Sequence, residues 1–334
     1  MSTPLVSVII VSFNTREVLR QCLQHLDAEV RNGFQAPDSQ LETVVVDNAS
    51  RDGSADMVER DFAHVSLIRS ETNLGFGPAN NLGFAAARGR YLVLLNSDAF
   101  LKPGSLIRAI RHMQADPTVG MGGARLIGRD GEFQPSARMF PSLFNDALAL
   151  TGLAARFPRS RLLGRADRTW ADPSQPCEAD WVPGAFAVVR RDLLERTGAF
   201  DERFFLYYEE VDLCRRIKAA GSTVRYWPDV EVVHLGGESS KTVRRLAMQS
   251  SGAQLALWRM RSALIYYRKN HGALAAWLAR VLEIGWHRLR ALKNRAARGA
   301  DAIAKRDESL AVIALMRTAW SDTRGGRVSP PQPW

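Results

Sequence analysis

The chain has 334 residues, of which 46% are hydrophobic and 24% charged, so it can bury one sizeable core and has room for a second small unit. This composition argues against a disordered chain. The three cysteines (Cys22, Cys177 and Cys214) are odd in number and form no Cys-x-x-Cys pair, which argues against a disulfide framework or a zinc site and favours a reducing cytoplasm.

The surplus of positive charge lies in the last part of the chain. Lys and Arg outnumber Asp and Glu by 45 to 35, but residues 241–334 alone hold 18 basic and 5 acidic residues. Residues 1–240 are therefore slightly acidic, with 27 basic and 30 acidic residues. This division predicts two functional regions.

The first elements predict an α/β domain. Residues 1–14 read MSTPLVSVIIVSFN, which indicates a first core strand and not a signal peptide, because no basic residue precedes the apolar run and no cleavage site follows it. Buried parallel strands are predicted at 6–11, 43–46, 65–69 and 91–95. Crossover helices are predicted at 15–30, 54–62 and 77–87, with Thr15 and Ser54 as N-caps.

Polar residues follow each of these strands. In open parallel sheets ligands bind beyond the carboxyl ends of the strands, so these residues would converge on one polar rim. The stretches that follow the strands contribute Ser12, Phe13 and Asn14 after the first strand, Asp47 after the second, Asn73, Gly75 and Phe76 after the third, and Asn96, Ser97 and Asp98 after the fourth.

The pattern loosens past Gly120, where Gly122-Gly123 precedes a Pro- and Arg-rich stretch at 134–176 that predicts a mobile loop. Order returns with WVPGAF at 181–186. Later elements are predicted as a strand to Val189, helices from Asp192 and at 209–220, strands at 223–227 and 230–234, and amphipathic helices from Ser250. The apolar segment 273–286 contains Arg280 and Glu283 and falls short of the roughly 20 residues that span a bilayer.

Asp98 is the candidate metal ligand. In reactions where a diphosphate is the leaving group its charge must be neutralised, and a divalent cation held by few carboxylates does this. A helix cap or an Asx turn explains Asn96-Ser97-Asp98 equally well. His234, at the end of an apolar strand, is a second candidate ligand, although a lone histidine is more often structural.

Asp47 and Glu210 are the other candidate site carboxylates. Asp47 can accept a hydrogen bond from the imide nitrogen of uracil or thymine, or it can form a turn with Ser50. Glu210 lies in FFLYYEEVD, where burial and like charge raise the pKa of a carboxyl, and it is the candidate general base. The alternative is a favourable interaction with the helix dipole, which we prefer for Asp212 with Arg216.

Other polar residues are interpreted as structural. Asp52-Gly53-Ser54 favours turn and capping chemistry over contact with a ligand.

Seven stretches in one order make residues 5–240 resemble the family 2 inverting glycosyltransferases of the GT-A fold, in particular their rhamnosyltransferase-like branch. They read VSVIIVSFN, VVVDNASRDGS, NLGFGPANNLGF, YLVLLNSD, WVPGAFAVVRR, FDERFFLYYEEVDLCRRIKAAG and VVHLGGESS. The resemblance implies a mixed, mostly parallel sheet flanked by helices.

The resemblance also implies roles for individual residues. Asp47 would bind the base, Asn73, Gly75, Phe76 and Asn80 would line the donor pocket, and Asp98 and His234 would bind magnesium or manganese. Trp181 and Gly184 would border the acceptor beside Glu209. Three positions depart from the family pattern: Asn96-Ser97-Asp98 has a single carboxylate, Glu210 stands where many relatives have Asp, and Ala79 stands where many have Arg.

The expected reaction is inverting transfer of a sugar from a dTDP or UDP donor, with dTDP-rhamnose as the best guess, to a hydroxyl of a glycan or a polyprenyl-diphosphate-linked acceptor. The product would be a lipopolysaccharide or cell-wall polysaccharide of a bacterial surface. The expected location is the cytoplasm or the inner face of the cytoplasmic membrane. A homo-oligomer is compatible with the sequence, which does not determine the oligomeric state.

The last part of the chain is predicted as a basic helical region at 241–320 after a catalytic domain at 1–240, with a disordered tail at 321–334. The helices would lie on an anionic membrane surface, or pack as an ordinary subdomain. Two other functions were weighed. A sugar-nucleotide nucleotidyltransferase should carry a glycine-rich phosphate loop after the first strand, and a nucleic-acid-binding protein leaves the acidic rim unexplained.

Overall fold

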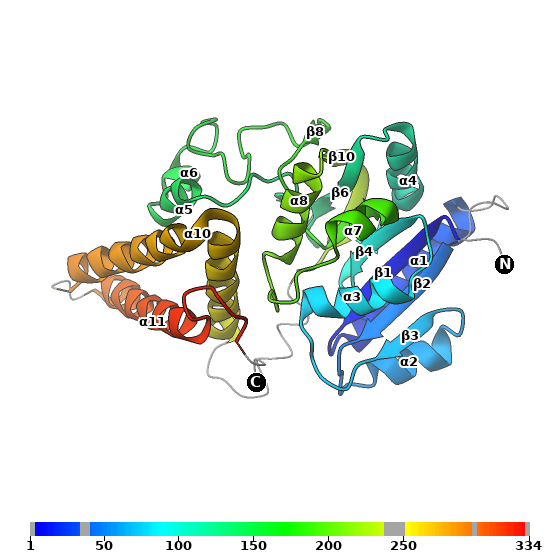
Figure 1. Cartoon of the computed structure of the whole chain (residues 1–334), viewed down its shortest axis with the longest axis horizontal. Coiled ribbons are helices and arrows are strands. Elements are labelled where there is room, and N and C mark those ends of the chain that lie inside the picture. The colour runs from blue at the N-terminus through cyan, green and yellow to red at the C-terminus, as the bar shows by residue number, and fades with distance from the viewer. Residues whose placement is uncertain (1–3, 34–40, 237–250, 296–298, 331–334) are drawn as a thin grey trace. The chain divides into compact units, whose positions relative to one another are not determined.

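The computed structural model describes residues 4–33, 41–236, 251–295 and 299–330, and these residues form two compact units (Figure 1). The sheet unit comprises residues 1–140, 171–202 and 209–247. The helical unit comprises residues 141–170, 203–208 and 248–334. Two segments that precede residue 240 thus belong to the helical unit. No helix in the described ranges is long and apolar enough to cross a membrane.

A ten-stranded sheet is the centre of the sheet unit. Eight strands follow the order β3-β2-β1-β4-β9-β6-β10-β5, while β7 pairs with β6 and β8 with β10. The strands are β1 (Val6–Ser12), β2 (Leu41–Asp47), β3 (Ser66–Arg69), β4 (Tyr91–Asn96), β5 (Ala99–Leu101), β6 (Val119–Ile127), β7 (Phe133–Gln134), β8 (Cys177–Glu178), β9 (Phe186–Arg190) and β10 (Thr223–His234).

The sheet is parallel from β3 to β4, as the βα pattern predicted, and mixed beyond it, where β9 runs antiparallel to both β4 and β6. The helices of this unit are α1 (Arg16–Gly33), α2 (Ser54–Asp61), α3 (Phe76–Ala86), α4 (Ser105–Ala115), α7 (Arg191–Thr197) and α8 (Glu209–Ala219). The result is a mixed, mostly parallel sheet with flanking helices, as the resemblance implied.

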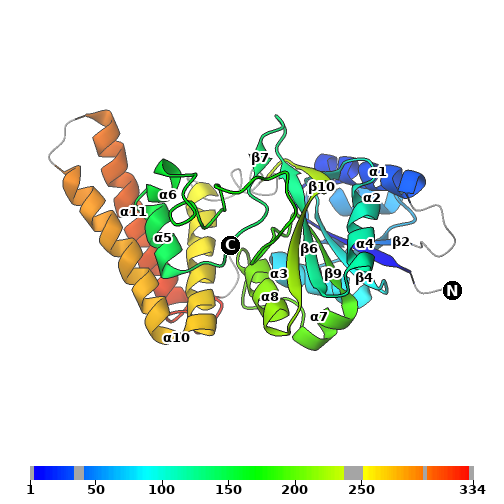
Figure 2. The same ribbon diagram turned by 90° about the horizontal axis from the view of Figure 1, so that it is seen from above.

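Helices lie on both sides of the parallel strands (Figure 2), and each side of these strands is apolar. Val8 and Ile10 of β1 pack in one cluster with the apolar sides of α1, α2 and α4. Ile9 points the other way, toward α3, where Gly83 lies so close that an added Cβ would come within 2.3 Å of it. Because alternate side chains of a strand face opposite sides, strands covered on both sides read as continuous apolar runs.

Strand β6 is where the sequence interpretation was wrong. Gly120, Gly122 and Gly123 suggested loosening structure, but they lie inside a nine-residue strand. A Cβ on Gly122 would come within 1.9 Å of the Trp227 ring, and one on Gly123 within 2.5 Å of Val182. These glycines therefore make room for neighbouring side chains in the core and do not form turns.

Two further expectations are corrected. Residues 223–234 form one strand whose register shifts between Trp227 and Glu231, where two strands were predicted. The stretch 134–176 contains β7 and two helices, α5 (Leu143–Leu150) and α6 (Leu153–Arg156), where a loop was predicted.

The helical unit contains α5, α6, α10 (Ser251–Lys293) and α11 (Ala300–Asp322). Helix α10 bends at Gly272, whose φ of 85° and ψ of 175° are not helical. Leu264 and Ile284, on either side of this bend, pack with Ile313 and Met316 of α11. After α11 the described chain continues in turns to residue 330, and the hydroxyl of buried Thr323 donates to the Ala319 carbonyl (2.7 Å). Residues 237–250, which include the end of the VVHLGGESS motif, and residues 331–334 lie outside the described parts.

Candidate active site

The ends of β1 and β2 lie side by side at the edge of the sheet. Ser12 is the register partner of Asp47, and the Asn48 amide donates to the Ser12 carbonyl (2.8 Å). The two following loops are also joined, because the Asn14 amide donates to Ser50 Oγ (3.0 Å) and Asn14 Oδ1 accepts from the Arg51 amide (2.7 Å). Phe13, between them, is half-buried.

Asp47 forms the turn with Ser50 that was one of the two interpretations considered for it, and its other oxygen takes no part in that turn. Its Oδ2 accepts from the Ser50 amide (3.0 Å), which forms the turn. Its Oδ1 is buried and has no hydrogen-bond partner in the described ranges of the chain. Burial raises the pKa of this carboxyl. A buried acceptor without a partner is costly in a folded protein, so this oxygen suits a ligand N–H.

Asn48 was not among the predicted site residues, yet it holds the next loop. Its Nδ2 donates to Asn73 Oδ1 (2.9 Å) and to the Gly75 carbonyl (3.0 Å), and its Oδ1 accepts from the Leu74 amide (2.8 Å). Asn73 Oδ1 also accepts from the Gly75 amide (2.9 Å). Asn73 and Gly75 are thus fixed beside the end of β2. In the sequence, Asn48 was visible only as one of the polar residues that follow the strands. Its contacts are with a loop 25 residues away, and no motif or residue spacing indicates them.

Helix α3 places Phe76 near the predicted acceptor motif. A Cβ on Gly184 would come within 3.2 Å of the Phe76 ring, so a larger residue at 184 would press on that ring. The backbone of Gly75 has a φ of 87°, which glycine adopts without strain as the helix begins. Asn80 is buried and its Nδ2 donates to the Phe76 carbonyl within the same helix (2.9 Å).

A chain of hydroxyls connects β1 to the segment after β4. Thr15 Oγ1 lies 3.0 Å from Ser12 Oγ and donates to Ser97 Oγ (3.0 Å). Thr15 therefore does not direct its hydroxyl to helix α1, as expected of an N-cap. Asp52 caps this helix instead, because its Oδ2 accepts from the Arg16 amide at the start of α1 (2.8 Å). Its Oδ1 accepts from the Ser54 amide at the start of α2 (3.0 Å). The structural interpretation of Asp52-Gly53-Ser54 is confirmed, although the N-cap of α2 is Gly53 and not Ser54.

Asp98 and His234 are brought together from positions 136 residues apart. His234 pairs with Ala99 across β10 and β5, and its Nε2 lies 3.5 Å from Asp98 Oδ1. The Leu235 amide donates to the Asp98 carbonyl (3.0 Å). Asn96 Nδ2 lies 3.4 Å from the same His234 Nε2. Asn96 Oδ1 is buried and makes no hydrogen bond to any residue that the structure describes.

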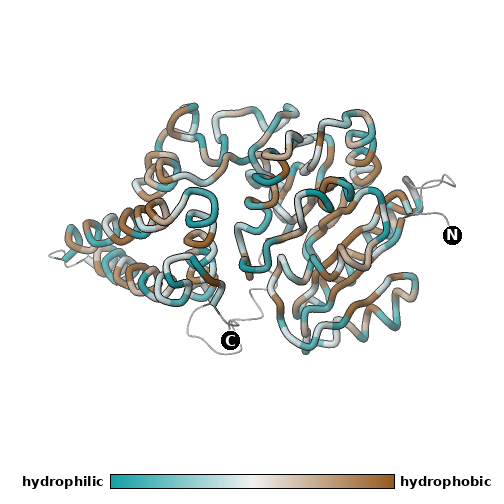
Figure 3. Tube along the Cα trace, viewed as in Figure 1, coloured by the Kyte–Doolittle hydropathy of each residue, from teal (hydrophilic) through white to brown (hydrophobic). Residues whose placement is uncertain are grey.

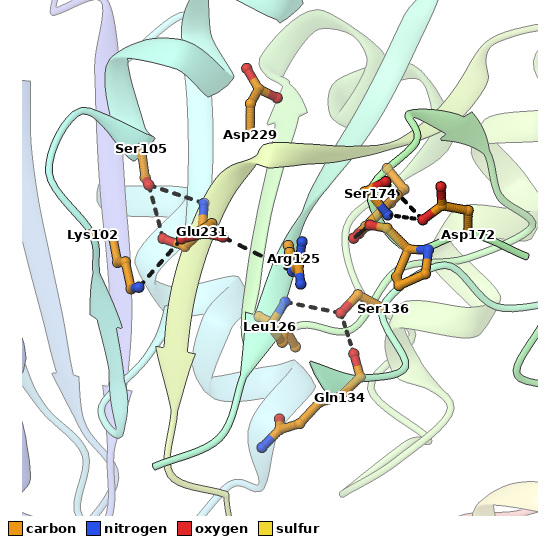
Figure 4. A network of polar contacts seen from close by, with 12 residues as sticks. Lys102, Ser105, Arg125, Leu126, Gln134, Ser136, Asp172, Ser174, Asp229 and Glu231 are labelled. Atoms are coloured by element: carbon orange, nitrogen blue, oxygen red, sulfur yellow. Dashed lines mark hydrogen bonds and ion pairs between the residues drawn. The ribbon is translucent and has the colours of Figure 1, made fainter. Parts of the chain in front are cut away.

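Gln134 of β7 determines which nitrogen of His234 carries the proton. The Gln134 amide Nε2 donates to the His234 carbonyl (3.0 Å), which leaves its Oε1 facing Nδ1 at 2.9 Å, so Nδ1 is the donor. Nε2 then keeps a lone pair toward Asp98. Ser136 supports this arrangement, because its Oγ donates to the Gln134 carbonyl (2.6 Å) and accepts from the Leu126 amide (3.1 Å; Figure 4). Fixing the tautomer in this way is typical of metal-binding histidines.

Asp98, His234 and Asn96 offer few ligand atoms, which suits a metal ion that is also coordinated by water or phosphate. In the described ranges no three His, Cys, Asp or Glu side chains gather as a metal site. Asp98 and His234 supply one carboxylate and one imidazole, with the partnerless amide oxygen of Asn96 beside them. Magnesium and manganese are commonly held by one or two protein ligands together with substrate phosphates and water. The chemistry of the donor set therefore suits such an ion.

Glu209 and Glu210 begin helix α8. Glu209 is buried, and Glu210 is half-buried with an Oε2 atom that is shielded from solvent and accepts no hydrogen bond from the described chain. Burial raises the pKa of Glu210, while the charge of Arg138 acts in the opposite direction. Asp212 is fully buried and binds Arg216 Nε (2.9 Å), and Arg216 also donates to three carbonyls at 197–199. The structural interpretation of this pair is confirmed.

Arg138 is another residue that the sequence analysis did not identify. Its guanidinium lies 4.7 Å from the centre of the Trp181 ring, and its main chain bridges to that of Trp181. Trp181 is held further by donation from its Nε1 to the Met139 carbonyl (2.9 Å). One cation thus lies on the predicted acceptor residue and acts electrostatically on the predicted base. Arg138 lies in an irregular, Arg-rich stretch of the sequence, where no periodic pattern distinguishes it from the other arginines.

The predicted residues thus fall into three local groups within the sheet unit. Asp47, Asn73 and Gly75 gather at the ends of β1 and β2, Asn96, Asp98 and His234 gather at β4, β5 and β10, and Glu210 has Arg138 and Trp181 for neighbours. Contacts of Ser12, Thr15 and Ser97 join the first two groups.

A family model described as glycosyl transferase family 2 matches residues 7–197, more than half of the chain. The chain belongs to glycosyl transferase family 2. Among the relatives of this family 2 member is the N-acetylglucosaminyl-diphospho-decaprenol L-rhamnosyltransferase of Mycobacterium tuberculosis, 30% identical over 63% of this chain and 71% of that protein. Rhamnosyltransferase WbbL of Escherichia coli is 23% identical over 80% of this chain and 94% of that protein.

Solved structures agree on the fold of this family 2 member. The mannosyltransferase PcManGT of Pyrobaculum calidifontis, in complex with GDP-Man and Mn²⁺, covers 96% of this chain and 88% of its own with a TM-score of 0.53 at 19% identity. Residues 1–349 of S. aureus TarS give a TM-score of 0.50 at 18% identity and cover 96% of this chain and 91% of their own. The GT-A fold expected from the motifs is confirmed, and the chain is a glycosyltransferase.

Proposed function

We propose that this glycosyltransferase moves L-rhamnose from dTDP-rhamnose, with inversion, to a hydroxyl of a lipid-linked glycan acceptor. The observation that carries the proposal is the pairing of Asp98 with His234 at 3.5 Å, next to strand ends where Asp47 keeps a partnerless buried oxygen. A cation site and a base-binding site side by side suit a nucleoside diphosphate. The choice of rhamnose as the sugar rests on two of the relatives named above, which are rhamnosyltransferases.

Asp47 is proposed to select the base of the donor. Its Oδ1 would accept from the imide N–H of thymine or uracil, which cytosine lacks. Asn73, Gly75, Phe76 and Asn80 would line the donor pocket with Ser12, Phe13, Asn14, Asn96 and Ser97. The fixed loop at 73–75 supports this role, because Asn48 holds it in place through three hydrogen bonds.

Asp98 and His234 would hold magnesium or manganese, which when bound neutralises charge on the departing diphosphate. Asp98 supplies the negative charge and His234 the neutral imidazole nitrogen whose lone pair Gln134 leaves exposed to the site. Asn96 would orient that imidazole through its amide. The solved structure of PcManGT, which has the same fold, is a complex with Mn²⁺, and this supports the choice of a cation of this class.

Glu210 would act as the general base. It takes the proton of the acceptor hydroxyl as that oxygen forms a bond to the anomeric carbon, while the bond from that carbon to the diphosphate oxygen breaks and the electron pair leaves with the diphosphate. A pKa raised by burial makes the carboxylate a stronger base than an exposed glutamate. Trp181, Gly184 and Glu209 would border the acceptor. The positive charge of Arg138, which acts on Glu210, supports the proposal that negatively charged groups bind here.

The acceptor is proposed to be a glycan on a polyprenyl diphosphate, and the second half of α10 to rest on the anionic membrane that carries it. Exposed apolar residues recur there at helical spacing, which places them on one side of the helix. They are Leu274, Trp277, Leu278, Val281, Leu289 and Leu292, called here the α10 stripe. Hydrophobic and hydrophilic stretches alternate along the trace of this helix (Figure 3). Exposed Arg288, Lys293 and Arg295 accompany it. A second copy would bring like charges together, whereas anionic lipid would neutralise them.

The test is a thermal-shift panel of nucleotide sugars with Mn²⁺ or with a chelator, because a ligand that binds the folded form raises Tm. We expect dTDP-rhamnose to give the largest shift, and the chelator to abolish most of it. Stabilisation by a CDP-sugar alone would contradict the assignment of Asp47, because cytosine has no ring N–H to donate. Equal shifts with and without metal would contradict the assignment of Asp98 and His234.

A further inference from the structure

The stretch between α6 and β8 is rich in arginine, and no step of the proposed reaction uses it. Residues 157–176 contain no helix or strand (Figure 1). Residues 156–170, called here the arginine loop, carry five arginines and a single acidic residue, Asp167, which gives them a net charge of +4. The arginines are Arg156, Arg159, Arg161, Arg165 and Arg168. All residues of the arginine loop belong to the helical unit.

The arginine loop holds a defined shape through its own contacts. Thr169 Oγ1 donates to the Pro158 carbonyl (2.7 Å), so the two ends of the loop meet. The Thr169 amide donates to the Gly164 carbonyl (3.2 Å), and the Gly164 amide donates to the Ser160 carbonyl (2.8 Å). A Cβ on Gly164 would come within 2.5 Å of Thr169 Oγ1. Compact surface loops that close on themselves are frequently functional, whereas a solvated run of charges needs no such closure.

Three of the arginines lie against aromatic rings. The guanidinium carbons of Arg161 and Arg168 lie 5.1 and 5.4 Å from the centre of the Trp170 ring. The guanidinium carbon of Arg165 lies 5.7 Å from the centre of the Phe144 ring in α5. Cations are attracted to aromatic rings at this range. The rings therefore help to keep like charges together that would otherwise repel one another.

The arginine loop also contains hydrogen-bond donors that are not matched by acceptors. Trp170 Nε1 and Arg165 Nε are both shielded from solvent, and neither has a hydrogen-bond partner among the residues that the structure describes. Arginine and tryptophan side chains donate hydrogen bonds and do not accept them. An anion with several oxygens satisfies such donors, and the planar guanidinium group matches the geometry of phosphate. Phosphate is therefore the ligand chemistry that this loop fits.

Exposed apolar side chains near the arginines favour a membrane over dissolved phosphate. Within the loop, Leu162 is 58% exposed and Phe157 is 44% exposed, and Phe144 and Leu153 of the preceding helices are exposed as well. A soluble anion gains nothing from such side chains. At a bilayer, in contrast, they enter the interface while arginines meet the headgroup phosphates. An RNA would stack on Trp170, but that ring already lies against two guanidinium groups.

We propose that the arginine loop binds the phosphate groups of anionic phospholipid and is a membrane contact of the helical unit in addition to the α10 stripe. Helix α5 connects the loop to α10, because Arg165 lies over Phe144 and Asp146 accepts from the Tyr267 hydroxyl (2.6 Å). The inference rests on the part of the proposed function that brings the helical unit to an anionic membrane.

The experiment measures sedimentation of the full chain with vesicles of phosphatidylcholine, alone or mixed with phosphatidylglycerol. Arg159→Gln together with Arg161→Gln removes two exposed charges from the loop. We expect about 30-fold weaker binding to the anionic vesicles, because each basic residue at such a surface contributes a factor of about five. The control is Lys305→Gln with Arg317→Gln, which removes the same charge from exposed positions of α11 and should bind as wild type does.

Thr169→Val tests the shape of the loop without changing its charge. Valine has nearly the size of threonine but cannot donate to the Pro158 carbonyl, so the loop should open and binding to anionic vesicles should fall several-fold. Binding as in wild type would show that the closed shape is not needed, and it would overturn the assignment of a built phosphate site.

Other outcomes also separate this inference from the proposed function. Wild-type vesicle binding by the Arg159 and Arg161 double variant, or an equal loss in the α11 control, would overturn the inference alone. So would complete displacement of the protein from vesicles by inorganic diphosphate at matched ionic strength, or a preference for RNA over vesicles. If the wild type binds no anionic vesicles at all, the membrane part of the proposed function fails first.

Discussion

The two units bury carboxyl groups in different ways. In the sheet unit, Asp47 and Glu210 each keep an oxygen that no described residue satisfies, and both have a raised pKa. In the helical unit, burial raises the pKa of Asp146 to about 6 and of Glu283 to about 7, but Asp146 accepts from the Tyr267 hydroxyl at 2.6 Å. The comparison teaches that a raised pKa alone does not identify a site. In the sheet unit the raised pKa is accompanied by a buried carboxylate oxygen without a described partner, at the end of β2 for Asp47 and in the first turn of α8 for Glu210, and it is this combination that marks them as candidates.

Replacing one glutamate in each unit is the strongest way to break this comparison. Glu210→Gln should lower kcat by about 100-fold or more, as expected for the loss of a general base, and leave the Kd of the donor nearly intact. The matched control is Glu283→Gln, because Glu283 is also half-buried and burial also raises its pKa. It should turn over within a few-fold of wild type in the same assay. A loss of similar size in both variants would mean that the two carboxyls do not differ in function.

Asp98→Ala tests whether the strand-end groups of the sheet unit bind a cation. Removing the carboxylate beside His234 should weaken metal-dependent donor binding by about 10- to 100-fold, a range typical of damaged metal sites. Calorimetry with manganese and with a chelator measures it. Asp27→Asn, a surface change at an ion pair with His64, serves as the control. An unchanged difference between metal and chelator would remove Asp98 from the site.

The α10 stripe sharpens the comparison from the side of the helical unit. Leu278→Glu together with Leu289→Glu should reduce binding to vesicles that contain anionic lipid by about 10-fold, because each change removes buried apolar area and adds a repelled charge. Leu310→Glu, at an exposed leucine of α11 outside the stripe, should bind as wild type does. Vesicle sedimentation measures the loss of binding. If the wild type instead forms dimers and does not bind vesicles, the stripe is an interface between copies.

The pH dependence of stability is the smallest expected effect. A carboxyl whose pKa is raised by folding binds its proton more tightly in the folded state, so the free energy of unfolding should fall as pH rises from about 4 to about 7, the range set by Asp146 and Glu283. Glu283→Gln should flatten this fall by about 1–2 kcal/mol, since one pKa unit corresponds to about 1.4 kcal/mol. Chemical unfolding at pH 5 and pH 8 tests it, and an equal slope in the variant would contradict the assignment.

For catalysis, the pH profile runs in the other direction. Glu210 must be deprotonated to act as a base, so activity should be present above its raised pKa and be lost as pH falls through it. The acidic limb of kcat/KM should therefore lie above the usual range of a glutamate. A limb at the ordinary value would mean that the base is exposed during the reaction.

The sequence predicted most of the parallel half of the sheet, because strands buried on both sides are continuous apolar runs and their polar ends follow at once. It failed at β6, where Gly120, Gly122 and Gly123 serve packing against neighbours that are distant in sequence, such as Trp227. The sequence also did not indicate the contacts of Gln134 and Asn48, whose partners are 100 and 25 residues away. It did not indicate Arg138 either, because that residue lies in an irregular stretch without a motif. Motifs identify residues that meet a ligand, whereas the residues that hold them in place need coordinates.

The interleaving of the two units bears on how this protein can be divided. A fragment that stops near residue 240 would keep residues 203–208 and lose Trp258, Ser262 and Tyr266, against which they pack. Such a fragment would expose Phe204 and Phe205, both buried in the whole chain, directly before the helix that bears Glu210. Exchange of the C-terminal helices between relatives would therefore have to be accompanied by exchange of those six residues.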